Sequence, residues 1–493
     1  MPKHIKIVRE LFELPAVNYN SIIKKREASV PDISMLNSEQ LNMFNGVMEL
    51  LSSDGGCIGV IEGTAGSGKT FSVSRIIEMY LSQHFDRRIC FSSTTNRSVK
   101  VSFKSTEFRH PSLDFATIHK LLALKETILI DGSIDFFPDK FIIPVISTYK
   151  VVFIDECSQF SKKLWAYLAP HIDNGLKVIM IGDPYQTPPV KETDSIVFTD
   201  KFKRENNAAT FRLTKIVRQA ADNPIIEVAS FVRDSIDRHI NLGQHYSYSN
   251  KIWQKDLGVQ LLDRGDRKDN SYFDALLSHA YTSDNFKADG NFVKCVAWRN
   301  KTVNALNKAI RRLIYGKGKL RRIEPMERLI TKQPVFDGQY DTVLINNGEQ
   351  LEVIDFERQQ ESINNGQYVL HYYDTKVRYY DLYNNAVIKR INIPTDLGVI
   401  AFNEVSTIMA EHAKSFKPGT AMASTAWREF YKFQKSFANV GHDYAGTVHT
   451  CQGQTIQNTI VLDFDIQGNR KLIERNKILY TGITRASDRL FII

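Results

Sequence analysis

Apolar and polar residues alternate in blocks along the first part of the chain. Runs rich in apolar and β-branched residues occur at 57–62, 88–93, 150–155 and 177–182. Helix-like stretches lie between most of these runs, and such alternation predicts an α/β fold in which crossover helices connect the strands of a parallel sheet. Residues 123–147 interrupt the pattern, because Asp131-Gly132 stands between two β-rich runs and predicts a β-hairpin.

The second part of the chain returns to the same pattern. A strand-like run at Phe292–Trp298 precedes a helix-like stretch at Thr302–Tyr315. Further strand-like runs occur at Thr459–Phe464 and Arg489–Ile493. A second parallel-type sheet is therefore expected, built partly from residues that lie far apart in the sequence.

The segment between these two stretches has a different pattern. Residues 340–393 are rich in Val, Ile and Tyr, and Asn347-Gly348 and Asn365-Gly366 have the composition of hairpin turns. We expect a small β-barrel-like insert there. Residues 405–438 are expected to be helical, and they carry many aromatic side chains.

Composition narrows the class of protein. The chain has 493 residues, of which 43% are hydrophobic and 24% charged, which suits several globular domains. A net charge of +9 favours a polyanionic partner such as nucleic acid, although a merely basic surface is the alternative. Five scattered cysteines without a CxxC pair indicate neither a zinc site nor a disulfide framework, and they fit a reducing compartment. No apolar signal core or membrane span is expected.

A glycine-rich sequence follows the first apolar run and precedes a helix-like stretch. It matches the P-loop, whose backbone N–H groups surround phosphate oxygens at a helix N-terminus. Lys69 is expected on the β- and γ-phosphates of ATP, and the Thr70 hydroxyl on Mg²⁺. The expected nucleotide contacts are Gly63, Thr64, Ala65, Gly66, Ser67, Gly68, Lys69 and Thr70.

The apolar run at 150–155 ends in two carboxylates, Asp155 and Glu156. A buried strand in a parallel sheet would deliver Asp155 beside the P-loop, where it can hold Mg²⁺. Glu156 would then orient and deprotonate the attacking water. A solvated strand end is the ordinary alternative, but the preceding P-loop favours the catalytic interpretation.

Three further motifs carry a family resemblance. Val178–Val190 reads VIMIGDPYQTPPV, Ala445–Thr455 reads AGTVHTCQGQT and Leu479–Ala486 reads LYTGITRA. With the P-loop, the acidic strand end and Gln40, these six motifs resemble in kind and order those of superfamily 1 DNA helicases. The inserts make the chain most similar to the 5′→3′ branch, the RecD/Dda-like helicases. Two positions depart from the family pattern: Thr187 stands where Leu is usual, and Gly482 where Ala is usual.

The resemblance implies two RecA-like P-loop domains with a small pin hairpin and an SH3-like β insert that carries a helical extension. The implied division is 1–35 as an N-terminal extension, 36–122 with 148–200 as RecA-like domain 1, 123–147 as the pin, 201–335 with 440–493 as RecA-like domain 2, and 336–439 as the SH3-like insert with its helices.

Roles at the nucleotide are also implied by the resemblance. Gln40 would read the adenine, and Gly453 would be a further nucleotide contact. Gln186 would sense the γ-phosphate, Arg485 would be an arginine finger from the second domain, and Arg218 a second phosphate-facing arginine, with a surface salt bridge as the alternative for Arg218. Guanidinium groups that arrive from the opposite domain stabilise the transition state only in a closed cleft, which would link hydrolysis to movement.

The family's single-strand contacts fall on small polar and histidine side chains. For Thr94 and Asn96 the alternative is a helix-capping role, and for His119 it is a buried imidazole whose hydrogen bonds are satisfied within the protein. The implied DNA contacts are Thr94, Asn96, Thr117, His119, Asn300, Thr447 and His449. The basic run from Lys308 to Arg322 lines the DNA path or forms a solvated face; both interpretations stay open.

Strand separation is assigned to aromatic residues. Phe136 and Phe137 lie in the expected pin, where one could stack on the parting base pair; core packing is the alternative for at least one of them. Trp427 and Tyr431 are four residues apart and share one face of a predicted helix. That face would brace the pin or contact DNA, or it is an ordinary aromatic core stripe.

The motifs therefore predict an ATP-dependent helicase that tracks along single-stranded DNA and opens forked duplex. A single-strand translocase that displaces proteins, and a DNA-binding module gated by nucleotide without turnover, are the alternatives. ATP and Mg²⁺ are the expected cofactors. Single-strand-binding or replisome proteins are expected as partners. The protein is expected to be a monomer and to lie in the cytoplasm, which would be the host cytoplasm if a phage encodes the chain.

Overall fold

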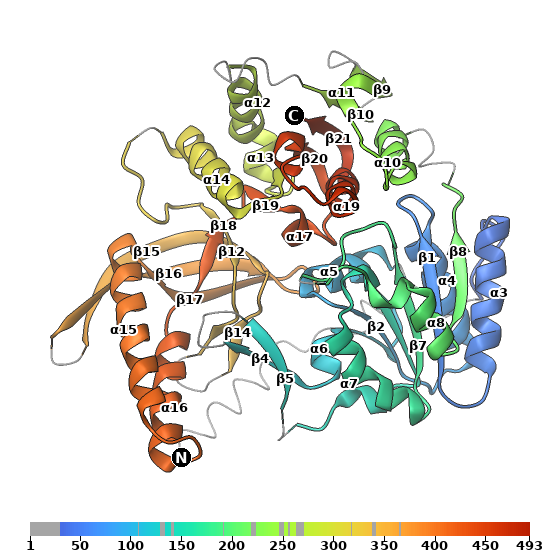
Figure 1. The fold of residues 1–493 in the computed structure, drawn as a ribbon, viewed down its shortest axis with the longest axis horizontal. Coiled ribbons are helices and arrows are strands. Elements are labelled where there is room, and N and C mark those ends of the chain that lie inside the picture. Colours follow the sequence, from blue (N-terminus) through green and yellow to red (C-terminus); the bar gives the residue numbers. More distant parts are fainter. Residues whose placement is uncertain are drawn as a thin grey trace.

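The computed structural model describes residues 30–106, 108–128, 134–139, 142–190, 192–217, 223–245, 251–254, 257–262, 271–316, 318–337, 342–363 and 366–493. Arg218, the Asp131-Gly132 turn, Asn365 and most of the expected N-terminal extension lie outside these residues. Figure 1 shows three bodies: one at the lower right, one at the top and one at the lower left.

The body at the lower right, lobe one, is a six-stranded sheet in the order β3-β2-β6-β7-β1-β8, with every pairing parallel. Val60 and Ile61 are both fully buried, in hydrophobic clusters on opposite faces of β1, as expected for a sheet covered by helices on both sides. The strands are β1 Cys57–Gly63, β2 Ile89–Ser93, β3 Leu113–Thr117, β6 Val151–Asp155, β7 Lys177–Gly182 and β8 Ala209–Leu213. The helices are α3 Ser38–Ser52, α4 Lys69–Gln83, α5 Asn96–Ser105, α6 Ile118–Leu121, η1 Val145–Thr148, η2 Cys157–Gln159, α7 Lys162–Asp173, η3 Ile196–Phe198 and α8 Asp200–Glu205.

The body at the top, lobe two, has a second six-stranded sheet in the order β19-β11-β20-β21-β10-β9. All of its pairings are parallel except that of the edge strand β9 with β10. The strands are β9 Lys251–Gln254, β10 Leu257–Leu261, β11 Val293–Ala297, β19 Ala445–Thr447, β20 Ile456–Val461 and β21 Ala486–Ile492. The helices are α10 Pro224–Asp234, α11 Leu242–His245, α12 Ser271–Thr282, α13 Asp284–Ala288, α14 Asn300–Tyr315, α17 Val448–Cys451, α18 Asp463–Ile466 and α19 Leu472–Ile483.

The body at the lower left, the antiparallel domain, holds a five-stranded sheet in the order β17-β16-β15-β12-β18. Two helices pack on each other beside it (Figure 1). Its elements are β12 Arg328–Thr331, β13 Val335–Phe336, β14 Val343–Ile345, β15 Gln350–Ile363, β16 Tyr368–Tyr380, β17 Ala386–Pro394, α15 Asp396–Ser415, α16 Ala421–Lys435 and β18 Val440–His442. The β-rich and helical character expected for 340–393 and 405–438 is thus present.

The pairings correct two of the expected boundaries. Lobe one does not end at residue 200, because β8 pairs in parallel with β1 and completes the first sheet. Lobe two does not include the segment just before 335, because β12 pairs with β15 and with β18 in the antiparallel sheet. Strand pairing joins residues that lie far apart in the sequence, and composition alone does not show it.

A β-hairpin leaves lobe one between α6 and η1. Its strands, β4 Leu124–Ile128 and β5 Ile134–Pro138, pair antiparallel. In Figure 1 the hairpin lies between lobe one and the antiparallel domain. No helix in the described part of the chain is long and apolar enough to cross a membrane.

Candidate nucleotide site and single-strand groove

The P-loop connects β1, which ends at Gly63, to α4, which begins at Lys69. Gly66 and Gly68 have φ angles of +78° and +77°, which only glycine adopts easily, and they turn the backbone inward. Lys69 Nζ donates to the carbonyl oxygens of Gly63 at 2.6 Å and Thr64 at 3.0 Å, so the ammonium group lies over the loop. The sequence thus forms the phosphate cradle in its expected strand-to-helix context.

Gln40 lies against this loop. Its side-chain oxygen accepts from the Asn37 backbone in a capping box at the start of α3, and its Nε2 donates to the Ser67 carbonyl at 2.9 Å. A Cβ atom at Gly68 would come within 2.4 Å of the same Nε2. Gln40 therefore supports the P-loop backbone directly; its contact with adenine stays a prediction.

Asp155 is the last residue of β6, and Glu156 follows it at the same edge of the sheet. Asp155 Oδ1 accepts from the Glu156 backbone N–H at 2.8 Å, and Glu156 has a φ angle of +56°, a strained value for this residue type. Burial raises the pKa of both carboxyl groups, although the positive charge of Lys69 opposes the shift in both. Oxygen donors from Thr70 and Asp155 are the kind that Mg²⁺ prefers, together with phosphate oxygens and water.

Arg485 reaches the same cleft from the end of α19 in lobe two. Its guanidinium is buried, donating to the Thr481 carbonyl at 3.1 Å and the Thr484 hydroxyl at 3.1 Å. The Gln186 amide lies 3.3 Å from both Arg485 Nη2 and Glu156 Oε2, and these neighbours orient its oxygen toward the arginine and its nitrogen toward the carboxylate. The structure therefore brings Glu156, Gln186 and Arg485 together, as the motifs predict.

Several groups that join the lobes were not predicted. The Tyr480 hydroxyl donates to Asp183 at 2.7 Å and accepts from the Ala65 backbone N–H of the P-loop at 3.2 Å. Gln452, at the end of α17, contacts Gln159 at 2.7 Å and donates to the Ser158 hydroxyl at 2.8 Å. Both Tyr480 and Gln452 lie within recognised motifs, but nothing in the sequence shows which residue of the other lobe each one meets.

The two departures from the family pattern have different consequences. Thr187 is fully buried, its hydroxyl donates to Gln452 at 2.8 Å, and its backbone N–H donates to the Thr481 hydroxyl at 3.1 Å. Threonine thus adds an interlobe hydrogen bond that leucine cannot make. A Cβ atom at Gly482 would meet its neighbours no closer than 3.6 Å, so alanine would fit there.

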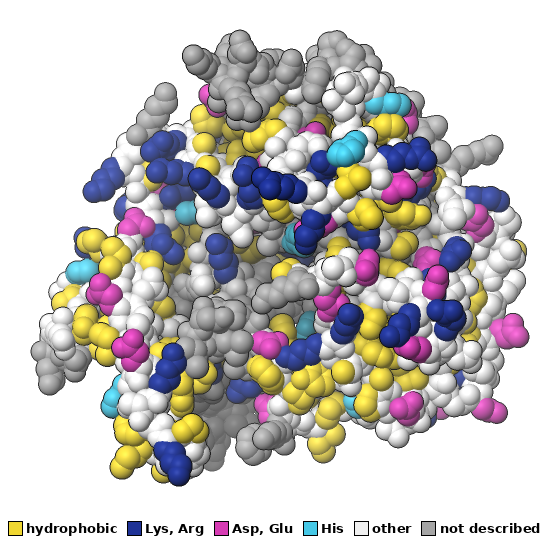
Figure 2. Space-filling view, viewed as in Figure 1, with side chains coloured by type: hydrophobic (Ala, Val, Ile, Leu, Met, Phe, Trp, Pro, Cys, Tyr) yellow, Lys and Arg dark blue, Asp and Glu magenta, His cyan; other side chains and the backbone are white. Residues whose placement is uncertain are grey.

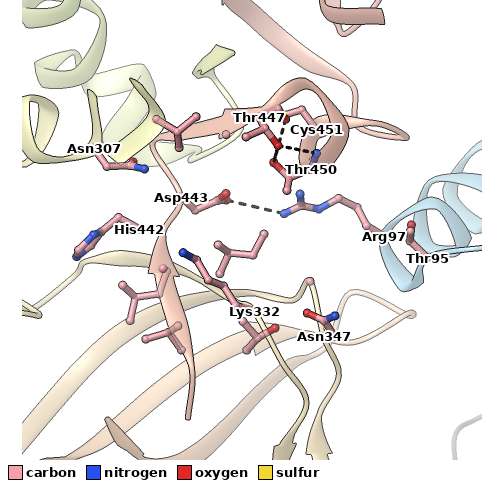
Figure 3. A pocket seen from close by; sticks show the side chains of 18 of the residues that line it. Thr95, Arg97, Asn307, Lys332, Asn347, His442, Asp443, Thr447, Thr450 and Cys451 are labelled. Atoms are coloured by element: carbon pink, nitrogen blue, oxygen red, sulfur yellow. Dashed lines mark hydrogen bonds and ion pairs between the residues drawn. The ribbon is translucent and has the colours of Figure 1, made fainter. Parts of the chain in front are cut away.

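A groove of about 1590 Å³ runs between lobe one, lobe two and the antiparallel domain. Figure 3 shows the part of it around Asp443 and Arg97. Its walls carry eleven Lys and Arg residues but three Asp and Glu residues, a balance that suits a polyanion. The lining includes all the DNA contacts that the resemblance implied: Thr94, Asn96, Thr117, His119, Asn300, Thr447 and His449.

Sequence comparisons agree with this architecture. Residues 35–244 match the family model described as AAA domain, and residues 442–493 match that of the UvrD-like helicase C-terminal domain. The chain is 26% identical to the ATP-dependent DNA helicase dda of Enterobacteria phage T4 over 93% of this chain and 99% of that protein. It is 25% identical to the uncharacterized protein R530 of Acanthamoeba polyphaga mimivirus, over 92% of this chain and 99% of that one.

The chain is a superfamily 1 helicase of the RecD/Dda-like branch. It is accordingly an ATP-hydrolysing DNA helicase. Among solved structures it is similar to the Pif1 helicase from Bacteroides bound to single-stranded DNA, with a TM-score of 0.46, 15% identity and 92% coverage of each chain.

Both lobes of the helicase present a threonine and a histidine to the groove in the same way. Thr117 and Thr447 end edge strands β3 and β19, and their hydroxyls cap α6 and α17 by accepting from backbone N–H groups at 3.3 and 3.2 Å. At α5 the cap is Thr95, not Thr94 or Asn96. The Thr94 hydroxyl is buried and has no hydrogen-bond partner in the described part of the chain, so it remains able to bind a ligand.

Two of the groove histidines, His119 and His449, are neutral near pH 7. Burial lowers the pKa of His119 to about 4, although a hydrogen bond to the Thr94 backbone opposes the shift, and burial also lowers the pKa of His449. The His119 ring lies on the Phe136 ring of the hairpin, with centroids 4.0 Å apart. His119 therefore serves as a packed hydrogen-bonding group and not as a cation.

This lowered pKa predicts a pH-dependent stability. His119 is neutral in the folded helicase but takes up a proton near pH 6.5 when unfolded, so its contribution is complete above pH 6.5 and is lost as the pH falls toward 4. Between pH 7 and pH 5 we expect His119→Gln to lose less unfolding free energy than the wild type, by on the order of 1 to 2 kcal/mol. Urea denaturation at both pH values measures this difference. An equal loss in both proteins would contradict it, and exposed His279→Gln is the control.

The aromatic residues assigned to strand separation fall in two places. Phe136 and Phe137 pair with Glu126 and Lys125, toward the base of the hairpin and not at its tip. Phe136 packs against the core of lobe one, whereas Phe137 is 42% exposed, with Lys163 Nζ 4.2 Å from its ring centroid. Neither ring therefore lies at the tip, and stacking of either one on the parting base pair stays a prediction.

Trp427 and Tyr431 share one face of α16, as predicted. Their ring centroids are 5.9 Å apart and the rings are nearly parallel. Both rings also contact the buried Phe430. Trp427 and Tyr431 therefore contribute to an aromatic cluster around Phe430, and their predicted contact with the pin or with DNA stays a prediction.

The basic run from Lys308 to Arg322, which begins within α14, reaches the groove. Lys308, Arg312 and Lys319 line its wall, and Figure 2 shows a band of Lys and Arg side chains across the upper part of this face, over α14. Two arginines of the run, Arg311 and Arg321, also line the groove and are ion-paired there with Glu327 and Glu324. The run therefore contributes to the groove wall, and part of its charge there is balanced by ion pairs.

Gly453 allows the two lobes to approach closely. Its φ angle is +71°, and a Cβ atom there would lie 2.1 Å from the Ser98 hydroxyl of α5. The residue thus faces the helix that follows the Thr94 segment. Its predicted nucleotide contact stays a prediction.

Proposed function

We propose that this helicase moves 5′→3′ along single-stranded DNA and separates forked duplex by coupling Mg-ATP hydrolysis to opening and closing of its two lobes. The observation that carries the proposal is the meeting of Glu156 and Gln186 of lobe one with Arg485 of lobe two. A finger that arrives from the opposite lobe makes hydrolysis depend on lobe closure. Every group named comes from one chain, so a monomer suffices.

Each residue of the cleft has a distinct role. Lys69 holds the β- and γ-phosphates, with the P-loop N–H groups of α4 around them. Thr70 and Asp155 would hold Mg²⁺, which supplies positive charge to the phosphate oxygens when bound. Glu156 orients the attacking water and accepts its proton, and Arg485 stabilises the charge that spreads over the γ-phosphoryl oxygens.

A continuous chain of contacts supports coupling between nucleotide and strand. One atom of the Gln186 amide lies 3.3 Å from Glu156 Oε2 and 3.1 Å from Gln452 Nε2, and the other atom lies 3.3 Å from Arg485 Nη2. Gln452 ends α17, and the cap of that same short helix is Thr447 on the groove wall. A change at the γ-phosphate can therefore reach Thr447, a proposed DNA contact, through Gln186 of lobe one and Gln452 of lobe two.

The inserts complete the proposed helicase. The β4–β5 hairpin serves as the pin that divides the two strands, and the antiparallel domain serves as an SH3-like insert with α15 and α16 as its extension. The contact between the His119 and Phe136 rings supports this assignment, because it ties the hairpin to the wall of the groove. Phe137, the exposed aromatic, is the ring available to DNA at this end.

Polarity and unwinding are tested together with one duplex that carries either a 5′ or a 3′ single-stranded tail. We expect ATP-dependent strand displacement from the 5′-tailed substrate only, measured by fluorescence release. Displacement of the 3′-tailed substrate alone would contradict the proposed 5′→3′ direction of movement. Hydrolysis stimulated by both tails without displacement from either would favour the single-strand translocase instead. Glu156→Gln, which keeps the size of the side chain but removes the group that accepts the proton, is the hydrolysis-deficient control and should displace neither substrate.

A further inference from the structure

Arg97 occupies the junction between the two lobes. It lies in the first turn of α5, and its side chain extends across the groove toward Asp443, beside Thr447 and Thr450 of the second lobe (Figure 3). The side chain is 16% exposed, and Nη2 lies 3.8 Å from Asp443 Oδ2, too far for a hydrogen bond. This nitrogen is buried and has no hydrogen-bond partner in the described residues.

The charge at this junction is not balanced. Asp443 Oδ1 accepts from Lys294 at 2.5 Å, and Oδ2 accepts from the Gln350 amide at 2.5 Å. One carboxylate therefore faces two cations, and the nearer of them, Lys294, is buried with it. A guanidinium donor that is buried without a hydrogen-bond partner is costly unless an anion completes its surroundings.

The surroundings of Arg97 fit one phosphate group. A guanidinium presents a planar set of donors that matches phosphate oxygens, and the groove that it lines carries mainly basic residues. Thr447 and Thr450 place hydroxyl groups on the same wall, as Figure 3 shows. We propose that Arg97 binds one backbone phosphate of the tracked strand where the lobes meet, with Asp443 positioning its guanidinium. This inference rests on the proposed movement along single-stranded DNA.

The junction also makes this phosphate contact sensitive to the distance between the lobes. Arg97 belongs to lobe one, whereas Asp443 lies between β18 and β19, at the edge of lobe two. Movement of one lobe relative to the other would change the position of the guanidinium in the groove. Arg97 would then hold its phosphate most firmly in one stage of the ATP cycle.

The salt dependence of DNA binding tests the proposal. Binding of an oligothymidylate to the full chain is measured by fluorescence anisotropy over a series of salt concentrations. Loss of one phosphate contact should make the slope of log K against log salt shallower by about 0.7 in Arg97→Gln. Arg97→Lys should keep the wild-type slope because it keeps the charge. Lys104→Gln is the control, since Lys104 is exposed on the same helix and away from the groove lining.

A strand that carries a single neutral methylphosphonate identifies the phosphate. When this group is moved along the oligonucleotide, one position should weaken binding of the wild type but leave the affinity of Arg97→Gln unchanged, because Arg97→Gln has already lost its contact with that phosphate. A slope of Arg97→Gln equal to that of Lys104→Gln, or a penalty that is the same in both proteins at every position, would overturn the assignment. Should Arg97→Gln fail to fold, wild type and Arg97→Lys are compared instead: the slope should stay the same, but the methylphosphonate penalty at that one position should be smaller in Arg97→Lys because lysine lacks the planar set of donors. An equal penalty at that position in both proteins would then overturn the assignment. Absence of any wild-type binding would instead contradict the proposed function.

Discussion

Replacing Lys69 with alanine is expected to lower DNA-stimulated ATP hydrolysis by about a hundredfold to a thousandfold. The Lys69 ammonium lies over the P-loop carbonyls of Gly63 and Thr64, where the β- and γ-phosphates are expected. Removing it takes away a positive charge from a site in which negative charge must be held at the transition state. Phosphate release in the presence of excess single-stranded DNA measures the effect.

Single-strand binding separates this loss from misfolding. Lys69 is not among the residues that line the groove, so Lys69→Ala should bind an oligonucleotide as the wild type does. Lys162→Ala, at an exposed position of lobe one, should hydrolyse ATP normally. Unchanged hydrolysis in Lys69→Ala would contradict the assigned phosphate site and, with it, every role given to the cleft.

Replacing Arg485 with alanine is expected to lower kcat by about a thousandfold or more. Arg485 is the cation that lobe two contributes beside Glu156, and an arginine finger acts on charge that develops in the transition state. The KM for ATP should change much less, because the P-loop and Lys69 of lobe one remain. Steady-state hydrolysis over a range of ATP concentrations separates the two parameters.

Arg485 also has structural partners, and the controls must account for them. Its guanidinium donates to backbone and hydroxyl oxygens of Thr481 and Thr484, so thermal unfolding of each variant is measured alongside activity. Arg485→Lys keeps the charge but not the planar fork and should recover only part of the rate. Arg470→Ala, at an exposed position of the same lobe, should be unchanged. A loss confined to KM would show that Arg485 binds nucleotide and does not act as the finger.

The pattern of the sequence predicted most of the central strands because these strands are buried on both faces. β1, β6 and β7 appear as short apolar runs, and each lies within a residue of its predicted position. The edge strands were not recognised. β8 alternates between exposed and part-buried residues, and β3 is largely half-buried, so neither forms an apolar run. Their membership in the sheet depends on pairing with β1 and β2.

The chemical groups of the nucleotide cleft could be identified from short motifs, since each motif carries its own local geometry. A P-loop needs only a strand, a glycine-rich turn and a helix, and the acids need only a buried strand end. The interlobe bonds of Thr187 and Tyr480 could not be identified in this way. Their partners, Gln452 and Asp183, lie 265 and 297 residues away along the chain.

By itself the sequence determined which residues carry charge, which can bend around a phosphate and which must be buried, because these are properties of side chains and their near neighbours. Only the tertiary structure decided that Arg485 faces Glu156, that Arg97 crosses toward Asp443, and that seven scattered polar residues line one groove. Such meetings depend on how two sheets and an inserted domain pack together. Packing is a property of the whole folded chain, and no local stretch of it contains that information.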